Sequence, residues 1–240
     1  RDAALCEAGR ALADRAGVPQ SFVQADALVC AAWPKRGEHA VALHACGHLH
    51  RRLVQRATEV GAAGLDIAPC CYHLGATESY LPLSPGTLLE LTRDDLRLAV
   101  TETVTAKSRE TRLRDRGLAW KLGFDAYRRR LGHDEYRTFK PVPEGWLRGS
   151  FFEFMQHMTM REGLPPLALA HADEFEAIGW RRHREVMHFS VVRHAFRRAL
   201  EVWLALDLAR YLEQSGFAVT LGTFCERTLT PRNLLLSARR

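Results

Sequence analysis

Hydrophobic and polar positions in the first third of the chain change period several times, and each change predicts a new element. Residues 2–16 repeat small and apolar side chains every three to four positions, which predicts a helix that Gly17 and Pro19 end. The same spacing at residues 48–61 predicts a second helix. Short apolar runs predict strands at residues 21–25, 40–45 and 64–68. This order of strands and helices predicts a parallel sheet of the βαβ kind.

Two of these predicted strands stop abruptly at clusters of polar, sulfur and aromatic residues. After the run at 40–45 come Cys46, Gly47 and His48, and after the run at 64–68 come Cys70, Cys71, Tyr72 and His73. In open α/β sheets, ligands bind outside the carboxyl ends of the strands. The pattern therefore predicts the place of a functional site as well as the class of fold.

The second half of the chain is mostly helical in pattern. Helices are predicted at residues 108–131, 146–161 and 172–183, with Thr92 as the N-cap of a further one. The broadest apolar stripe predicts a helix over residues 189–214 that Gly216 ends; its apolar positions are Phe189, Val192, Phe196, Leu200, Trp203, Leu206 and Leu212. Strands are predicted at residues 217–225 and 233–238. Because the loop between them is too short for a crossover helix, these two strands are expected to be antiparallel.

Charge and cysteine content narrow the class of protein without deciding its function. The 240 residues carry 34 Lys and Arg against 28 Asp and Glu, a net charge of +6, and all but four of the basic residues are Arg. A basic chain is compatible with an RNA or DNA partner, although a GC-rich coding sequence also produces abundant Arg. The chain has no apolar run of about 20 residues and no signal peptide, so no membrane association is expected. Its six cysteines predict reduced thiols in a cytoplasmic protein.

The paired strand ends carry a resemblance to a known family. His-Ala-Cys-Gly at 44–47, Pro-Cys-Cys-Tyr-His at 69–73 and Pro-Arg-Asn at 231–233 resemble the methyltransferase-like 25 proteins and a glutathione S-transferase C-terminal-domain-containing protein. The first two motifs also resemble a family of tRNA 2′-O-methyltransferases. The resemblance implies a class I S-adenosylmethionine-dependent methyltransferase: a Rossmann-like sheet, mostly parallel with a final antiparallel strand, formed by residues 1–83 and 189–240. Residues 84–188 would be a helical insertion that recognises the substrate.

The cofactor implied by the resemblance is S-adenosyl-L-methionine. Asp2 matches an acidic position that holds ribose hydroxyls, and Asp26 matches one beside the adenine amino group, with loop capping as the alternative for Asp26. The full set of matching positions is Asp2, Asp26, Ala27, His44, Ala45 and Cys46. One departure is clear: the chain contains no Gly-x-Gly turn, which the resemblance would place upstream of Arg1.

Catalytic candidates lie at the two strand ends. Methyl transfer needs an aligned acceptor and, for an oxygen or amine acceptor, a base. His73 is the favoured base or substrate-orienting residue, and Tyr72 would stack on a flipped base or serve as a pocket wall. The candidate catalytic set is His73, Tyr72, Cys70 and His44. The cysteines are interpreted as small buried residues, and no metal is expected, although Cys46, Cys70, Cys71 and the nearby histidines are ligand types that zinc accepts.

Candidate RNA contacts are spread over three segments. They are Cys71, Arg128, Arg129, Arg130, Arg232 and Asn233. Arg232 and Asn233 could instead tie the last hairpin to the sheet, and the run at 128–130 could be a solvated helix face. The favoured interpretation is a methyltransferase acting on tRNA or rRNA, with no obligate protein partner. The alternatives are a methyltransferase for a protein or small molecule, and a non-catalytic RNA- or protein-binding module.

Overall fold

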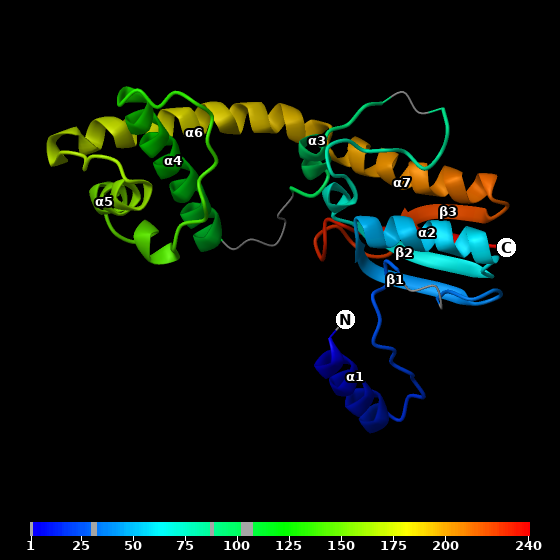
Figure 1. The fold of residues 1–240 in the computed structure, drawn as a ribbon. Helices are drawn as coiled ribbons and strands as arrows, with labels where there is room; N and C mark the ends of the chain where they lie inside the picture. The colour runs from blue at the N-terminus through cyan, green and yellow to red at the C-terminus, as the bar shows by residue number, and fades with distance from the viewer. Residues whose placement is uncertain (1, 30–32, 87–88, 102–107) are drawn as a thin grey trace. The chain divides into compact units, whose positions relative to one another are not determined.

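The computed structural model describes residues 2–29, 33–86, 89–101 and 108–240, so Arg1 and Cys30 lie outside the described residues (Figure 1). The chain forms two compact units. Unit 1 comprises Arg1–Val104 and Arg197–Arg240, and unit 2 comprises Thr105–Phe196. Within the described ranges, no helix has the length and apolar content needed to cross a membrane.

Unit 1 is built on a four-stranded sheet. Its strands are β1 (His39–Cys46), β2 (Gly64–Cys70), β3 (Ala218–Thr223) and β4 (Leu234–Arg239), in the spatial order β1-β2-β4-β3. β1 and β2 are parallel, whereas β4 is antiparallel to both β2 and β3. Three strands therefore share one direction and the final strand runs opposite to them. The expected mixed α/β sheet and its antiparallel C-terminal hairpin are confirmed.

Two helices bury one face of the sheet. α2 (His48–Val60) and α7 (Arg197–Gln214) contact each other as well as the strands, so they lie side by side on the same face (Figure 1). The apolar core between them includes Leu53, Val54, Leu65, Ile67, Leu208, Leu212 and Leu236. The opposite face carries polar side chains such as Asp66 and Ser237, together with the exposed apolar side chains Val41 and Leu43 of β1.

The predicted strand at residues 21–25 is wrong. This segment forms no strand in the described chain, although the preceding helix α1 (Ala3–Ala16) begins and ends as expected. Phe22 packs instead against Gly9 of α1, where an added Cβ would come within 2.5 Å of the ring. Nη1 of Arg10 lies 3.5 Å from the carbonyl oxygen of Phe22 and donates to it. Phe22 therefore packs on the helix beside it rather than in a sheet, while Val23 is exposed.

The single helix predicted over residues 189–214 is also wrong. The structure has α6 (Ala172–Ala195) and then α7, with a break at Phe196. Phe189, Val192 and Phe196 are more than 60% exposed, so the first half of the apolar stripe does not face a core. The first turn of α7 instead buries Arg197, which lies 3.2 Å from Glu201 and donates to the carbonyl oxygen of Ala99. The helix prediction was wrong because α7 buries this ion pair at its start, where the periodicity indicated apolar side chains.

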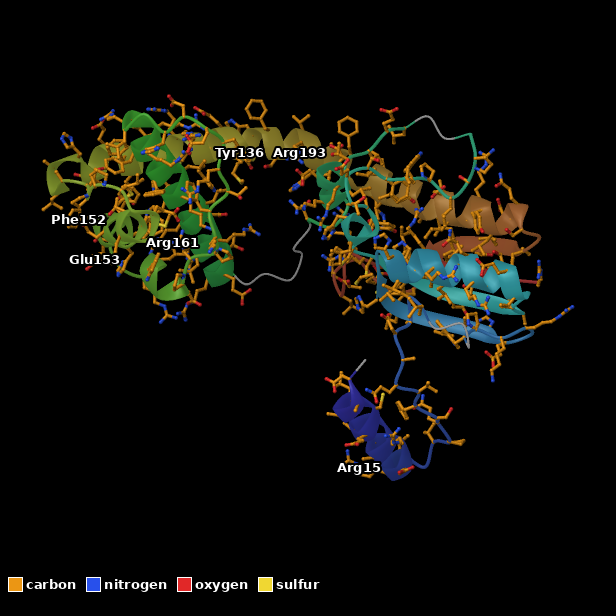
Figure 2. The ribbon with its side chains drawn as sticks, viewed as in Figure 1. Arg15, Tyr136, Phe152, Glu153, Arg161 and Arg193 are labelled. Carbon is orange, nitrogen blue, oxygen red and sulfur yellow. The ribbon has the colours of Figure 1, made fainter. Side chains whose placement is uncertain are left out.

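Unit 2 is a helical unit with an aromatic core. Its main helices are α4 (Ser108–Arg130), α5 (Phe151–Glu162) and α6, with 3₁₀ turns at Glu144–Leu147 and Leu169–His171. The core of this unit includes the aromatic residues Trp120, Phe124, Tyr127, Phe151, Phe154 and Phe175. Figure 2 labels Glu153, which completes a capping box with Ser150 at the start of α5, and Arg161, which lies over the ring of Trp146.

A third, smaller core lies beside the strand ends in unit 1. α3 (Arg93–Leu98) begins at Thr92, whose side chain forms a capping box with Asp95. It packs against the 3₁₀ turn Tyr72–Gly75 that follows β2, and its Leu96 is fully buried. Contact with α7 is made through Leu204. α3 thereby holds the segment that carries Tyr72 and His73 in place.

Candidate functional site

The backbone at the ends of β1 and β2 departs from regular strand geometry. His44 (φ 61°) and Cys71 (φ 47°) are the non-glycine residues with positive φ in the part of the chain that the structure describes. The pairing of β1 with β2 also changes register between Leu43 and Cys46. A non-glycine residue in the left-handed region is uncommon, and register irregularities re-aim side chains. Both departures occur where the sequence predicts the site.

These departures bring three thiols together. Sγ of Cys46 lies 3.2 Å from Sγ of Cys70, and the Sγ atoms of Cys46, Cys70 and Cys71 all lie within 4.8 Å of one another. Nδ1 of His44 is 3.8 Å from Sγ of Cys70. Burial, together with the neighbouring thiols, raises the pKa of Cys70 and of Cys71 above the ordinary value. Burial therefore favours the neutral thiol form of Cys70 and Cys71, and at Cys71 the positive charge of Arg232 partly opposes this effect.

His73 occupies the 3₁₀ turn directly after this cluster. Its Nδ1 is buried and accepts no hydrogen bond from any described residue. Burial lowers the pKa of His73 below 6.5, and the positive charges of Arg97, Arg93 and Arg232 lower it further. The imidazole is therefore neutral at pH 7 and has a ring nitrogen able to accept a proton.

Tyr72 lies behind His73 in the interior. Its side chain is 2% exposed, and its ring meets that of His50 edge-on at 5.5 Å between centroids. Burial, with Glu201 nearby, raises the pKa of Tyr72 well above its ordinary value. A ring so enclosed favours the alternative role of pocket wall over stacking on a substrate base. His50 is also enclosed, and burial lowers its pKa to about 4.

Three of the proposed cofactor residues line cavities in unit 1. A cavity of about 370 Å³ is lined by Ala25, Asp26, Ala27, Leu28 and Leu49, and a smaller one of about 120 Å³ includes Ala27 and Ala45 among its lining residues. Oδ1 of Asp26 accepts the backbone N–H of Leu28 at 3.1 Å, which is the loop-capping contact. Asp2 lines neither cavity; its carboxylate caps α1 by accepting from the N–H groups of Ala4 and Leu5.

A further cavity of about 390 Å³ was not anticipated from the sequence. Its lining includes Leu28, His48, Arg51, Arg52, Thr77 and Ser79. Leu28 also lines the cavity beside Asp26, so the two hollows are neighbours. Arg93 and Arg97, which approach His73 from α3, were likewise missed. Their N-cap was visible in the sequence, but the packing of α3 on the turn at His73 is a tertiary contact without a local signal.

The remaining candidates make structural contacts. Arg232 donates to the carbonyl oxygen of Val100 at 3.0 Å, and Nδ2 of Asn233 donates to that of Cys225 at 2.7 Å. Oδ1 of Asn233 accepts from Arg198 at 3.1 Å. These contacts support the alternative in which Arg232 and Asn233 tie the last hairpin to the rest of unit 1. Arg232 remains close enough to His73 to affect its pKa.

The arginine run at the end of α4 is also engaged within its own unit. Arg128 is 1% exposed and pairs with Asp125 and Glu135. Arg129 pairs with Asp125 at 2.9 Å, and Arg130 pairs with Glu174 at 2.6 Å. Arg128 therefore stabilises the fold of unit 2 from the inside, whereas Arg129 and Arg130 keep a third or more of their side-chain surface exposed.

Comparison with known proteins gives one match. Residues 2–78 match the family model described as a methyltransferase domain. No curated protein and no solved structure matches the chain. The matched region contains the cavity beside Asp26, both strand ends, the thiol cluster and His73. It supports a methyltransferase domain, and the mixed sheet with its reversed final strand is consistent with that fold.

Proposed function

We propose that this protein is an S-adenosylmethionine-dependent methyltransferase that modifies RNA, with tRNA or rRNA as the substrate class. The proposal rests on the methyltransferase-domain match over residues 2–78. The observation that carries its chemistry is His73, a neutral histidine with a buried, unpartnered Nδ1 at the carboxyl end of β2. The motifs at 44–47 and 69–73 further support a relationship to the methyltransferase-like 25 proteins and the tRNA 2′-O-methyltransferases, and hence a Rossmann-like domain.

The cavity beside Asp26 fits the nucleoside part of the cofactor. Its volume of about 370 Å³ lies in the range of small-molecule sites, and its walls are the apolar side chains of Ala27, Leu28 and Leu49. The carboxylate of Asp26 is an acceptor suited to an adenine amino group. Asp26, Ala27 and Ala45 would hold this part of the cofactor, and His44 and Cys46 would border the methionine part.

The protein needs to supply one acid–base step in this reaction, which is removal of the proton of the acceptor. When bound, S-adenosylmethionine supplies a methyl group activated by a positively charged sulfur. His73 accepts the proton that an acceptor hydroxyl or amine loses as its bond to the methyl carbon forms. The walls at Tyr72, Cys70 and His44 keep water away and hold the 3₁₀ turn in place, so that the acceptor is aligned. Such a base contributes about 10²- to 10⁴-fold in rate.

Positive charge near this base supports a polyanionic acceptor. Arg93, Arg97 and Arg232 lie close enough to His73 to lower its pKa, and Arg51 and Arg52 line the cavity of about 390 Å³. Residues 105–196 hold 17 Lys and Arg against 12 Asp and Glu. We place substrate recognition in the insertion 84–188, where Arg129 and Arg130 would contact phosphates of the RNA. Outside the insertion, Cys71 would contact the substrate close to the catalytic base His73. The free thiols support a cytoplasmic protein.

The direct test is transfer of a tritiated methyl group from S-adenosylmethionine to total RNA. We expect label in RNA that ribonuclease removes and protease does not. Replacement His73→Ala is expected to lower kcat by about 100-fold while leaving affinity for S-adenosylhomocysteine unchanged. The control is His133→Ala, which removes an exposed histidine of unit 2. Label that protease removes would point to a protein acceptor, and unchanged turnover in His73→Ala would exclude His73 as the base.

The pH profile separates a base from a residue that only shapes the turn. Since the pKa of His73 is lowered from 6.5, the acidic limb of kcat against pH is expected below pH 6.5, with a plateau above it. In His73→Ala this limb should disappear. Salt-dependent RNA binding without any methyl transfer would instead support the non-catalytic alternative.

A further inference from the structure

The three thiols at the strand ends form an arrangement that a regular sheet would not produce. Consecutive residues of a strand point to opposite faces, so Cys70 and Cys71 would ordinarily lie apart. The left-handed conformation of Cys71 (φ 47°, ψ 46°) turns its side chain to the same side as that of Cys70. On β1, the register change between Leu43 and Cys46 accompanies the approach of Cys46 to Cys70. Two local departures therefore converge on one cluster.

The spacing of these atoms suits a tetrahedral metal ion. Zinc binds thiolate sulfur at about 2.3 Å, which places two sulfur ligands of a tetrahedron about 3.8 Å apart. The observed sulfur separations begin at 3.2 Å and reach no more than 4.8 Å, on either side of that value. Nδ1 of His44 lies 3.8 Å from Sγ of Cys70, but it does not lie within 4.8 Å of all three sulfurs, so His44 would have to move toward Cys46 and Cys71 to act as the fourth donor. Three cysteines and one histidine are a ligand set that structural zinc sites use.

We propose that Cys46, Cys70, Cys71 and His44 bind one zinc ion that fastens the carboxyl end of β1 to that of β2. The ion would compensate the charge of three thiolates held side by side and would account for the two left-handed residues in this part of the chain. Because His73 follows Cys71 by two residues, the ion would also fix the start of the turn that carries His73. This inference does not depend on methyl transfer: the site would bind zinc in a chain of any function.

The test begins with the metal content of the chain. Protein purified under reducing conditions is expected to contain about one zinc per chain by elemental mass spectrometry. After removal of zinc, added Co²⁺ should give the intense visible absorption of tetrahedral cobalt and a thiolate charge-transfer band in the near ultraviolet. Cys46→Ser and Cys71→Ser should lose stoichiometric zinc and the cobalt bands. Cys225→Ser, which removes a thiol outside the cluster, should keep both.

A further variant tests the fourth ligand. His44→Ala is expected to retain the charge-transfer band but shift the visible cobalt spectrum, since three thiolates remain. A folding defect is distinguished from ligand loss by the circular dichroism of each variant with and without zinc. The proposal is overturned by wild-type protein that gains only the weak spectrum of hydrated cobalt, or by equal binding in Cys46→Ser and Cys225→Ser. A Cys46–Cys70 disulfide persisting under the reducing conditions would also overturn it.

Discussion

At the scale of single residues, Asp207 shows how one buried carboxylate shapes the surroundings of the site. Its oxygens accept from the Tyr80 hydroxyl at 2.7 Å, from the N–H of Leu83 at 2.9 Å, and from the N–H and hydroxyl of Ser84, each at 2.8 Å. The side chain is 2% exposed. One residue of α7 thus holds the segment that runs from the site toward α3.

Removing this carboxylate is expected to be costly. Asp207→Ala removes the carboxylate that accepts these four hydrogen bonds and should lower the free energy of unfolding by about 3 kcal/mol. Urea titration followed by circular dichroism measures the loss. Asp14→Ala, at an exposed position of α1, is the control and should change stability by less than about 0.5 kcal/mol. Equal effects in both variants would contradict the role given to Asp207.

Asp66 joins three strands on the other face of the sheet. Its carboxylate accepts from Ser237 and Arg239 of β4 and lies 2.8 Å from Nε2 of His39 on β1. Burial alone would raise the pKa of Asp66, but the hydrogen bonds from Ser237, Arg239 and His39 outweigh it and lower the pKa to about 2. The carboxylate is therefore more acidic in the folded chain than in the unfolded chain.

This shift predicts a pH-dependent contribution to stability. Because the folded pKa is below the unfolded value of about 3.9, the contribution is complete above pH 5 and is lost as the pH falls from about 4 through 2. Wild type should exceed Asp66→Asn in stability at pH 5, and the difference should shrink toward pH 2. Thermal unfolding of both proteins across this range is the measurement. A difference independent of pH would refute the assignment.

At the scale of elements, unit 2 depends on a close approach of two helices. A Cβ added to Gly179 of α6 would lie 2.3 Å from the carbonyl oxygen of Ala119 and 2.9 Å from the backbone nitrogen of Gly123, both on α4. Contact between backbones leaves no flexible side chain to move aside. The helices pack this closely because residue 179 on α6 and residue 123 on α4 are both glycine.

Replacement Gly179→Ala should therefore separate α4 from α6. We expect a loss of about 1–3 kcal/mol in the stability of unit 2, in spite of the better helix propensity of Ala. Limited proteolysis, with cleavage sites mapped by mass spectrometry, detects the opening within residues 108–196. Gly145→Ala is the matched control, since a Cβ there meets nothing within 4 Å. Faster cleavage confined to unit 1 would contradict this prediction.

Elements with strong local signals were predicted from the sequence, and those set by distant contacts were not. β1 and β2 follow from short apolar runs, and α2 from its periodicity and from Gly61, which ends it in a left-handed conformation. The break at Phe196 could not be predicted, because it depends on the burial of an Arg197–Glu201 pair beside Ala99. Caps and alternation are local information, whereas the identity of the partner that covers an apolar face is not.

The same distinction applies to the candidate site. Its location at the ends of β1 and β2 was predicted, and the structure brings His44, Cys46, Cys70 and Cys71 together there. The positive surroundings of His73 were not predicted, since Arg93 and Arg97 reach it only through the packing of α3 on the turn after β2. The burial of Arg128 inside unit 2 was also not predicted, because a run of three arginines gives no sign of which side chain is buried.

At the scale of the whole molecule, the chain combines a sheet-based unit with a helical unit that interrupts it in sequence. Unit 1 holds the region that matches a methyltransferase domain, together with the thiol cluster and His73. Unit 2 supplies a folded, arginine-rich body with its own aromatic core. This division supports the proposal that unit 1 carries the chemistry and that the insertion contributes to recognition of a polyanion.

The most direct test of the central claim is calorimetric titration of S-adenosylhomocysteine into the protein. The account predicts saturable one-to-one binding in the micromolar range, weakened at least about tenfold in Asp26→Ala and unchanged in Asp14→Ala. His73→Ala should bind as wild type does, since His73 is assigned to the acceptor. Absence of binding under conditions in which the protein is folded would contradict the assignment of this chain as an S-adenosylmethionine-dependent methyltransferase.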